Sequence, residues 1–202
     1  GVDWSGVKGV TTGIDIKPSP NIPIYGAKMT IKTPNLSVYK SHTLVARNIT
    51  IGSRNVSLLR LDLNASDSSE HIRITNLPII LNTTASTTDF TNCSLFDLIS
   101  NTVLMTGQNV IQPSGSGVNH AYNYVLDGNG LLISRGQVSQ VDLKCDISSS
   151  AKSGKTIHWD LPSNASSTYA IAMPSGQKIN VTIVAGAGPV MTLTQASSTS
   201  GN

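Results

Sequence analysis

Four histidines are the side chains of this sequence best suited to proton transfer or to metal binding. They are His42, His71, His120 and His158. No two have the His-x-x-x-His spacing that places two imidazoles on one helix face, and none belongs to a His-Glu-x-x-His motif. Because His71 and His158 alternate with apolar neighbours, we expect them at solvated strand positions and not as ligands.

Other catalytic signatures are missing from the sequence. It contains no Gly-x-Ser-x-Gly elbow, no phosphate-binding P-loop and no Gly-x-Gly-x-x-Gly turn after a predicted strand. A nucleophilic Cys93 stays open as an alternative, but "TNCSLFD" carries no protease signature and buried or bridged cysteines are far commoner. The sequence therefore predicts a protein that is not an enzyme and that uses no metal or cofactor.

Carboxylates occur on predicted strands without forming a catalytic pair. Asp62, Asp142, Asp146 and Asp160 lie on the outward faces of these strands, close to Lys or Arg, so we expect solvated charges. Asp127, in "DGNG", shares only a fragment of a calcium loop and lacks its distal glutamate. We expect a turn there, not a calcium site.

The two cysteines, Cys93 and Cys145, permit two interpretations. An even pair in a chain with a secreted composition is compatible with one disulfide. Two buried, reduced thiols are the alternative, because sequence cannot show whether the two Cα atoms come within bonding distance.

Asparagine acceptor triplets of the form Asn-x-Ser/Thr are dense in this sequence. They favour a glycosylated exterior, and the alternative is polar filling of outer strand faces. The eight acceptors are Asn35, Asn48, Asn55, Asn64, Asn82, Asn92, Asn164 and Asn180.

Composition points to an extracellular β-protein. Charged residues make up only 12% of the chain and aromatics 4%, and Glu70 is the single glutamate, which disfavours long helices. The net charge of +3 does not indicate nucleic-acid binding, because the basic residues are scattered and form no phosphate-binding stripe. No stretch approaches the roughly 20 apolar residues of a membrane span.

Alternation of apolar and polar residues predicts strands throughout. "VDLKCDI" (141–147), "LLRLDLN" (58–64), "KTIHWDL" (155–161) and "KINVTIV" (178–184) each place their apolar residues on one face. "DGNG" (127–130) predicts a hairpin between "NYVL" and "LLIS". About a dozen short strands at such spacing predict an all-β, immunoglobulin-like antiparallel sandwich over residues 35–186. Residues 1–34 are expected to form an extended amino-terminal arm, and residues 187–202 a carboxyl-terminal strand and flexible tail.

Two blocks of the sequence resemble a known module. In the first, Glu70, Ile72, Ile74 and Leu77 match the end of the family's first block. In the second, "GLLISRGQVSQVDLKCDIS" matches at the positions Ile133, Gly136, Val141, Leu143, Asp146 and Ile147. The chain thus resembles the immunoglobulin-like module of prokaryotic S-layer-like and surface repeat proteins, of the kind found in candidate-phyla bacteria. The resemblance implies a structural role at the cell surface and offers no catalytic residue; the two cysteines are not part of the family pattern.

The two ends of the chain are similar to each other. "TGIDIKPSPNIPIYGAKMTIKT" (12–33) resembles the ending "KINVTIVAGAGPVMTLTQ" (178–195), with Ile14, Ile16, Met29 and Ile31 at the positions of Ile179, Val181, Met191 and Leu193. Two accounts are open: the chain is a cut from a tandem array, or it polymerises head to tail by donating the arm to a neighbour's sheet edge. In the second account Ile14, Ile16, Met29 and Ile31 form the donor-strand interface. TasA-like and archaeal thread-like fibres are analogues of such assembly.

We therefore predict an extracellular, cell-surface protein whose main partner is itself, in a filament or S-layer-like array. Other surface proteins or glycans are further possible partners. The alternative is an adhesin or carbohydrate-binding module of a larger surface protein, which requires exposed aromatic side chains. Few aromatics are available for that role, and Trp159 falls on an inward strand face.

Overall fold

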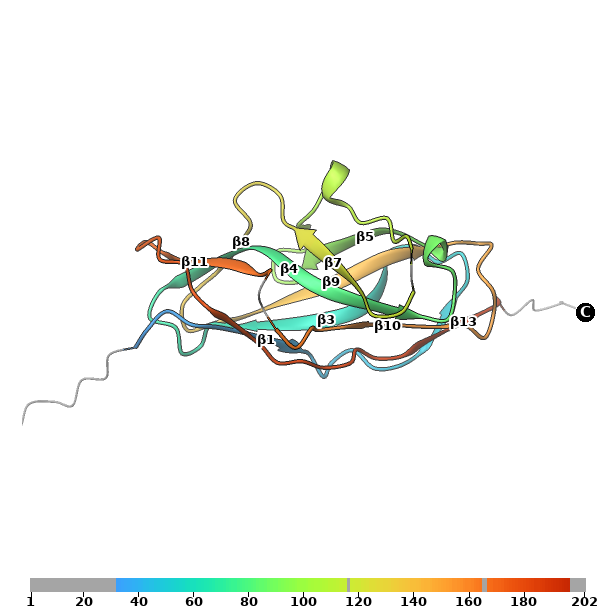
Figure 1. Ribbon diagram of the computed structural model, residues 1–202, viewed down its shortest axis with the longest axis horizontal. Helices are drawn as coiled ribbons and strands as arrows, with labels where there is room; N and C mark the ends of the chain where they lie inside the picture. The colour runs from blue at the N-terminus through green and yellow to red at the C-terminus, as the bar shows by residue number, and fades with distance from the viewer. Residues whose placement is uncertain (1–31, 116, 165–166, 197–202) are drawn as a thin grey trace, which may run out of the picture. The chain divides into compact units, whose positions relative to one another are not determined.

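The computed structural model describes residues 32–115, 117–164 and 167–196 (Figure 1). These residues form a sandwich of two β-sheets, with two short 3-10 turns, η1 (Thr87–Asp89) and η2 (Gly107–Asn109). The predicted all-β sandwich is confirmed. No helix in these ranges is long and apolar enough to span a membrane.

The first sheet, called sheet I here, has six strands. Their order is β12 (Val181–Ile183), β1 (Leu36–Lys40), β3 (Val56–Asn64), β9 (Val138–Ile147), β5 (Phe90–Asp97) and β6 (Thr102–Val103). Neighbouring strands are antiparallel except β12 and β1, which run parallel.

The second sheet, sheet II, is built around the long strand β4 (His71–Thr83). β11 (Tyr169–Met173) and β10 (Thr156–Asp160) share one side of β4, and β7 (His120–Val125) and β8 (Leu131–Ile133) share the other. Beyond β10 follow β13 (Met191–Thr194) and β2 (Asn48–Thr50), the latter parallel to β13.

The core lies between the two sheets and comes from the residues that the alternation selected. In β9, Val141, Leu143, Cys145 and Ile147 are at most 3% exposed. Trp159 of β10 is fully buried, which agrees with its predicted inward face and prevents it from stacking on a sugar. Period-two patterning was sufficient here because one face of each sheet is covered by the other sheet.

Pro78 marks a break in the hydrogen bonding of β4. β11 pairs with β4 as far as Asn76, and β10 pairs with it from Ile80 onward, so the residues between them have a neighbour only in β7. A proline has no N–H to donate, and this gap is a place in a central strand that tolerates it.

The predicted hairpin at "DGNG" is wrong. β7 and β8 both run antiparallel to β4, so they are two parts of one strand line interrupted by residues 126–130. The loop leaves the sheet and returns at Gly130, where a Cβ atom would lie 2.2 Å from the carbonyl oxygen of Ile74. The residues were correctly predicted to form a turn. Because β4 is long enough to pair with both flanking strands, the turn is a loop that interrupts one strand line and does not connect a hairpin.

The carboxyl-terminal segment passes from one sheet to the other. After β12, on the margin of sheet I, residues 184–190 cross to β13 in sheet II (Figure 1). Gly188 allows this crossing, because a Cβ there would lie 2.1 Å from the carbonyl oxygen of Trp159. Its N–H donates a 2.9 Å hydrogen bond to Oδ1 of Asp160. The strand that the crossing reaches, β13, pairs with β10 and β2 within sheet II.

Candidate functional site

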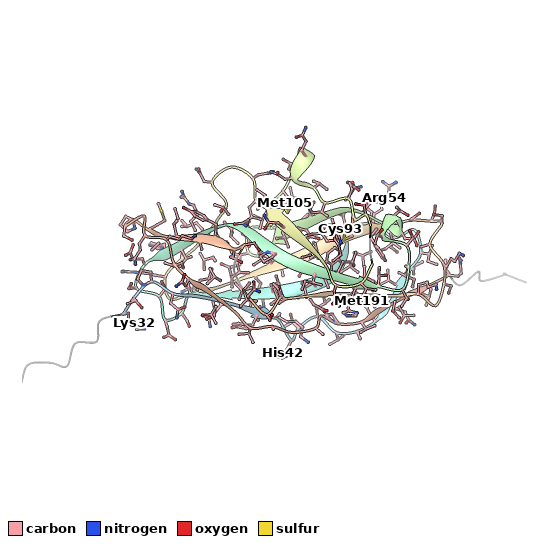
Figure 2. All side chains as sticks on the ribbon, viewed as in Figure 1. Lys32, His42, Arg54, Cys93, Met105 and Met191 are labelled. Carbon is pink, nitrogen blue, oxygen red and sulfur yellow. A yellow bond between two sulfur atoms is a disulfide. The ribbon has the colours of Figure 1, made fainter. Side chains whose placement is uncertain are left out.

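The histidines lie apart from one another, and each has a structural setting. His42 is exposed at the surface (Figure 2). Nδ1 of His71 accepts a hydrogen bond from the N–H of Arg135, and His158 lies 3.4 Å from Asp160. Within the described ranges, no group of three His, Cys, Asp or Glu side chains could hold a metal ion.

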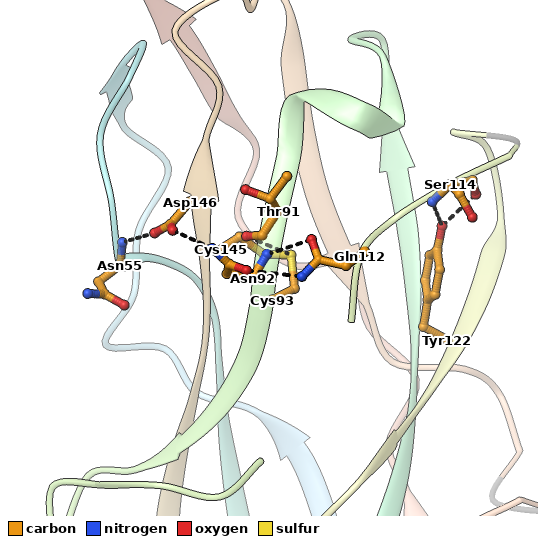
Figure 3. The surroundings of a disulfide bond; sticks show 9 residues. All are labelled: Asn55, Thr91, Asn92, Cys93, Gln112, Ser114, Tyr122, Cys145 and Asp146. Atoms are coloured by element: carbon orange, nitrogen blue, oxygen red, sulfur yellow. Dashed lines mark hydrogen bonds between the residues drawn. A yellow bond between two sulfur atoms is a disulfide. The ribbon is translucent and has the colours of Figure 1, made fainter. Parts of the chain in front are cut away.

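Cys93 and Cys145 form a disulfide between the neighbouring strands β5 and β9, so the bridged alternative is the one found (Figure 3). The Cα atoms are 4.1 Å apart, and both side chains are at most 1% exposed. The bond lies at a bulge, where Asn92 takes a positive φ of 52° and the register of β5 against β9 shifts. Burial keeps solvent reductants away from both sulfur atoms, which indicates a structural bond.

A hydrogen-bonded chain of side chains flanks the disulfide (Figure 3). The carboxylate of Asp146 accepts from the N–H of Asn55 at 2.8 Å and from Nδ2 of Asn92 at 2.9 Å. Oδ1 of Asn92 in turn accepts from Nε2 of Gln112 at 3.0 Å. Asp146 of β9 thus joins Asn55, which precedes β3, to Asn92 at the bulge of β5, and is not a free charge.

The structure separates the asparagine acceptors into two groups. Asn82 and Asn92 use both ends of their amides inside the fold: Asn82 donates to Asp160 and accepts from the N–H of Asn119, and Asn92 bonds as described above. Asn64 accepts a hydrogen bond from the N–H of Ser66. Asn64 and Asn82 are half-buried, whereas Asn92 and the remaining acceptors are exposed: Asn35, Asn48, Asn55, Asn164 and Asn180.

The four expected donor-strand residues, Ile14, Ile16, Met29 and Ile31, lie outside the described residues. The residues that they resemble are placed, however. Ile179 and Val181 are at most 8% exposed, and Met191 and Leu193 are fully buried. The carboxyl-terminal segment therefore fills its own positions in the sandwich, and a donated arm has to add at another sheet edge.

The longest such edge among the described strands is the outer side of β7 and β8, called the β7–β8 edge here. Both strands pair with β4, and no described strand pairs with their other side. Three other marginal strands of the described sheets, β2, β6 and β12, have two or three residues each, whereas β7 alone has six. The marginal strand β11 has five residues, but its other side already makes backbone hydrogen bonds with Gln177 and Ile179. An unpaired edge of this length presents backbone donors and acceptors to another chain.

Aromatic packing makes the inner face of β7 rigid. Tyr124 is fully buried and meets Trp159 edge-on with ring centroids 6.0 Å apart, and Tyr122 lies 5.8 Å from the same indole. Burial raises the pKa of Tyr124 well above its usual range. His120 packs against Tyr122 at 4.6 Å. The edge strand is therefore held in place by its inward side chains while its outer side stays open.

The outward face of sheet II beside this edge carries exposed aliphatic side chains around Arg73. In the cross-strand row Ile171–Arg73–Leu132, the aliphatic side chains flank the arginine. Leu132 is 49% exposed, and nearby Val125 is 41% exposed. Nε of Arg73 is buried and has no hydrogen-bond partner among the described residues. We call Arg73, Leu132, Ile171 and Val125 the Arg73 patch.

The outward face of sheet I is polar and ordered. Arg60 binds Asp142 through Nε at 2.6 Å and Nη2 at 2.9 Å, and the hydroxyl of Ser57 donates to the same carboxylate at 2.8 Å. The hydrogen bond with Asp142 raises the pKa of Arg60. The expectation of a solvated Asp142 is wrong, because this side chain is only 2% exposed under the guanidinium. Alongside, Nζ of Lys144 lies 4.5 Å from the ring centroid of Phe96.

A small pocket opens near the β9–β10 turn, with a volume of about 270 Å³. Hydroxyls and two lysines dominate its lining. It is formed by Thr84, Ala85, Ser86, Asp89, Ser150, Lys152 and Lys155. Such a lining suits a polar ligand and does not supply the apolar walls of a typical small-molecule site.

Sequence reasoning did not identify Arg73 or the β7–β8 edge. The signal for Arg73 was available in "HIRIT", where one arginine interrupts a strand of isoleucines. Whether Nε of Arg73 finds a hydrogen-bond partner, however, depends on which residues face it from β8 and β11. No local pattern in the sequence contains that pairing.

No protein-family model matches the chain, and no curated protein matches it either. Similar solved structures include cohesin modules. The seventh ScaB type I cohesin from Pseudobacteroides cellulosolvens is 10% identical, with 84% of this chain and 99% of that chain covered and a TM-score of 0.39. The cohesin module of a family 33 glycoside hydrolase from Clostridium perfringens is 8% identical, with 82% and 100% covered and a TM-score of 0.37. The sixth cohesin of scaffoldin B from Acetivibrio cellulolyticus, solved with a dockerin, is 13% identical, with 81% and 99% covered and a TM-score of 0.31. All three TM-scores lie below 0.5, so these likenesses carry no argument about this chain.

Proposed function

We propose that the protein is a structural subunit of an extracellular filament or surface array. In this proposal the amino-terminal segment of one copy adds as a strand to the sheet of the next copy. The observation that carries the proposal is the β7–β8 edge, the longest unpaired strand edge among the described strands. Strand addition supplies its affinity through main-chain hydrogen bonds and its specificity through alternate side chains.

The chain contains a segment suited to the role. Residues 1–31 precede the described sandwich, and "GIDIK" (13–17) and "AKMTIKT" (27–33) alternate as strands do. Extended at about 3.3 Å per residue, the segment reaches on the order of 100 Å, which is ample for contact with a second copy. Each copy would both donate and accept, and such a head-to-tail contact does not close, so it yields fibres.

A disulfide-bonded, all-β, sparsely charged chain is consistent with an extracellular site of action. The described residues offer no catalytic or metal constellation that would suggest another role. The resemblance to prokaryotic surface modules, given by the strand patterns around Glu70 and Asp146, supports the same location.

The test is assembly of the full chain, followed by light scattering and negative-stain electron microscopy. We expect the wild-type chain to form fibres and the double variant Ile14→Lys, Ile16→Lys to stay monomeric, because the charges prevent burial of the donor side chains. The matched control is Ser19→Lys, Asn21→Lys, which adds the same charge in the same segment without removing an apolar residue.

A wild-type chain that stays monomeric at all concentrations contradicts the proposal. Fibres formed equally well by the Ile14, Ile16 variant also contradict it. Addition of a synthetic peptide spanning residues 12–17 should slow fibre growth by occupying free edges, whereas a scrambled peptide should not.

The second candidate function is an adhesin or carbohydrate-binding module of a surface protein. The outward face of sheet I favours it, because Asp142 fixes Arg60 beside Lys144 and Phe96, and arginine and aromatic side chains are enriched in interfaces. Binding to a glycan or protein array that is lost in Phe96→Ala and Lys144→Ala would favour this function. Binding unaffected by either substitution would exclude this face.

A further inference from the structure

Arg73 is the starting point of this inference. It lies in the middle of β4, in register with Ile171 on one side and Leu132 on the other. Its Nε is buried and has no hydrogen-bond partner among the described residues, and no ion pair in that part of the chain involves it. A guanidinium with a buried, unpaired donor between two aliphatic side chains is costly, and a carboxylate that bound it would satisfy this donor.

None of the ion pairs among the described residues gives Arg73 a carboxylate partner. Every Asp and Glu side chain of the described residues already accepts a hydrogen bond or pairs with a cation. These are Asp62, Asp67, Glu70, Asp89, Asp97, Asp127, Asp142, Asp146 and Asp160. The remaining acidic residues of the sequence, Asp3 and Asp15, both lie in the amino-terminal segment.

We propose that Asp15 of a second copy binds Arg73, as part of a strand added to the outer side of β8; this rests on the proposed function. If "GIDIK" adds as an extended strand, the period of two puts Ile14 and Ile16 on one face and Asp15 on the other. β8 has the same pattern: Leu131 and Ile133 are buried, and Leu132 points outward. In matching register, Ile14 and Ile16 extend the buried row and Asp15 joins the outward row of the Arg73 patch.

The spacing of strands allows this contact. An added strand lies next to β8 and two strands from β4, which places the backbones of Asp15 and Arg73 on the order of 10 Å apart. An extended arginine and an aspartate side chain span that distance over Leu132, whose aliphatic side chain would then be covered. The ion pair would be partly desolvated by Leu132 and Ile171, which strengthens it relative to a solvated surface pair.

The experiment is a charge exchange in the full-length chain, with assembly measured by sedimentation and electron microscopy. We expect Arg73→Glu and Asp15→Arg each to weaken assembly about tenfold or more, because each leaves a charge facing its like. The double variant Arg73→Glu, Asp15→Arg should recover assembly to nearly the wild-type level. Thermal unfolding of each variant checks the fold, and Arg73→Gln replaces Arg73→Glu if the latter is unstable.

Two matched controls make the result specific. Asp3→Arg reverses the other carboxylate of the segment and should not rescue Arg73→Glu. Arg135→Glu reverses an exposed arginine that follows β8 and should leave assembly unchanged. Rescue by Asp3→Arg, or normal assembly of Arg73→Glu, overturns the Asp15 contact and leaves the strand-addition proposal standing. A monomeric wild-type chain instead overturns strand addition, and the contact with it.

Discussion

Arg60 and Asp142 face each other across β3 and β9, joined by two hydrogen bonds of 2.6 and 2.9 Å. The Asp142 side chain is almost completely covered, with 2% of it exposed, whereas 24% of the Arg60 side chain is exposed. The pair therefore combines a buried anion with a cation that still contacts water. This arrangement fixes the middle of the outward face of sheet I.

Removal of the cation should destabilise the fold strongly. In Arg60→Ala the carboxylate of Asp142 loses its charged partner and keeps only Ser57 as a side-chain donor, so we expect a loss of about 3 kcal/mol in the free energy of unfolding. Chemical denaturation measures it. The matched control is Asp62→Asn, whose carboxylate accepts from Gln140 on the same face and should cost well under about 1 kcal/mol. Equal losses of unfolding free energy in the two variants would show that the Arg60–Asp142 pair stabilises the fold no more than the contact of Asp62 with Gln140.

The disulfide should contribute a large share of the stability. It links residues 52 positions apart, and closure of a loop of that length in the unfolded chain corresponds to about 4 kcal/mol in the chain-entropy model. We expect Cys93→Ser, Cys145→Ser to melt well below the wild-type chain. The wild-type chain in reductant should keep its disulfide until it unfolds, because both sulfur atoms are buried. Mass spectrometry that detects rapid reduction of the disulfide while the protein is still folded would contradict this expectation.

Gly188 should tolerate no side chain. A Cβ at this position would lie 2.1 Å from the carbonyl oxygen of Trp159, so Gly188→Ala must push the crossing segment off β10, at a cost of about 1–3 kcal/mol. Gly186 provides the control, because a Cβ there meets nothing within 4 Å. Thermal unfolding of Gly186→Ala should match the wild type. A Gly188→Ala variant as stable as Gly186→Ala would refute the close approach.

Asp127 should make the packing of one loop sensitive to acid. Hydrogen bonds from the side chains of Thr106 and Asn109 lower its pKa from the ordinary 3.8. A lowered native pKa stabilises the contact at pH above 3.8, and this stabilisation is lost as the pH falls through the native pKa. Hydrogen exchange of residues 104–109 should therefore speed up in acid relative to neutral pH. In Asp127→Asn the exchange rates, corrected for intrinsic pH effects, should lose most of this dependence.

Glycosylation should avoid acceptor amides that hold other parts of the fold together. Asn82 and Asn92 bind other parts of the fold through both amide atoms, so a glycan on either would break native contacts. If the natural source attaches N-glycans, we expect peptide mapping to find them at Asn48 and Asn180, which are exposed, and not at Asn82 or Asn92. Full occupancy at Asn92 would contradict the structure around the disulfide.

The sequence predicted the fold class and the buried faces, because both depend on local alternation. Leu59, Leu61 and Trp159 are all buried as their spacing indicated. The sequence could not show whether "DGNG" joins two paired strands as a hairpin or loops out between two segments that pair with the same strand. Both arrangements use the same turn residues and differ only in the length of the partner strand. The sequence also missed the burial of Asp142, which depends on Arg60 from a strand 82 positions away in sequence.

The parallel pairing of β1 with β12 has a mechanical consequence. The described chain enters the sandwich at Lys32, beside the start of β1, and leaves after β13 at the opposite end (Figures 1 and 2). Tension applied to these two ends pulls β1 and the β12–β13 segment in opposite directions along their lengths. The hydrogen bonds between them are then loaded together in shear instead of one after another, a geometry that resists stretching.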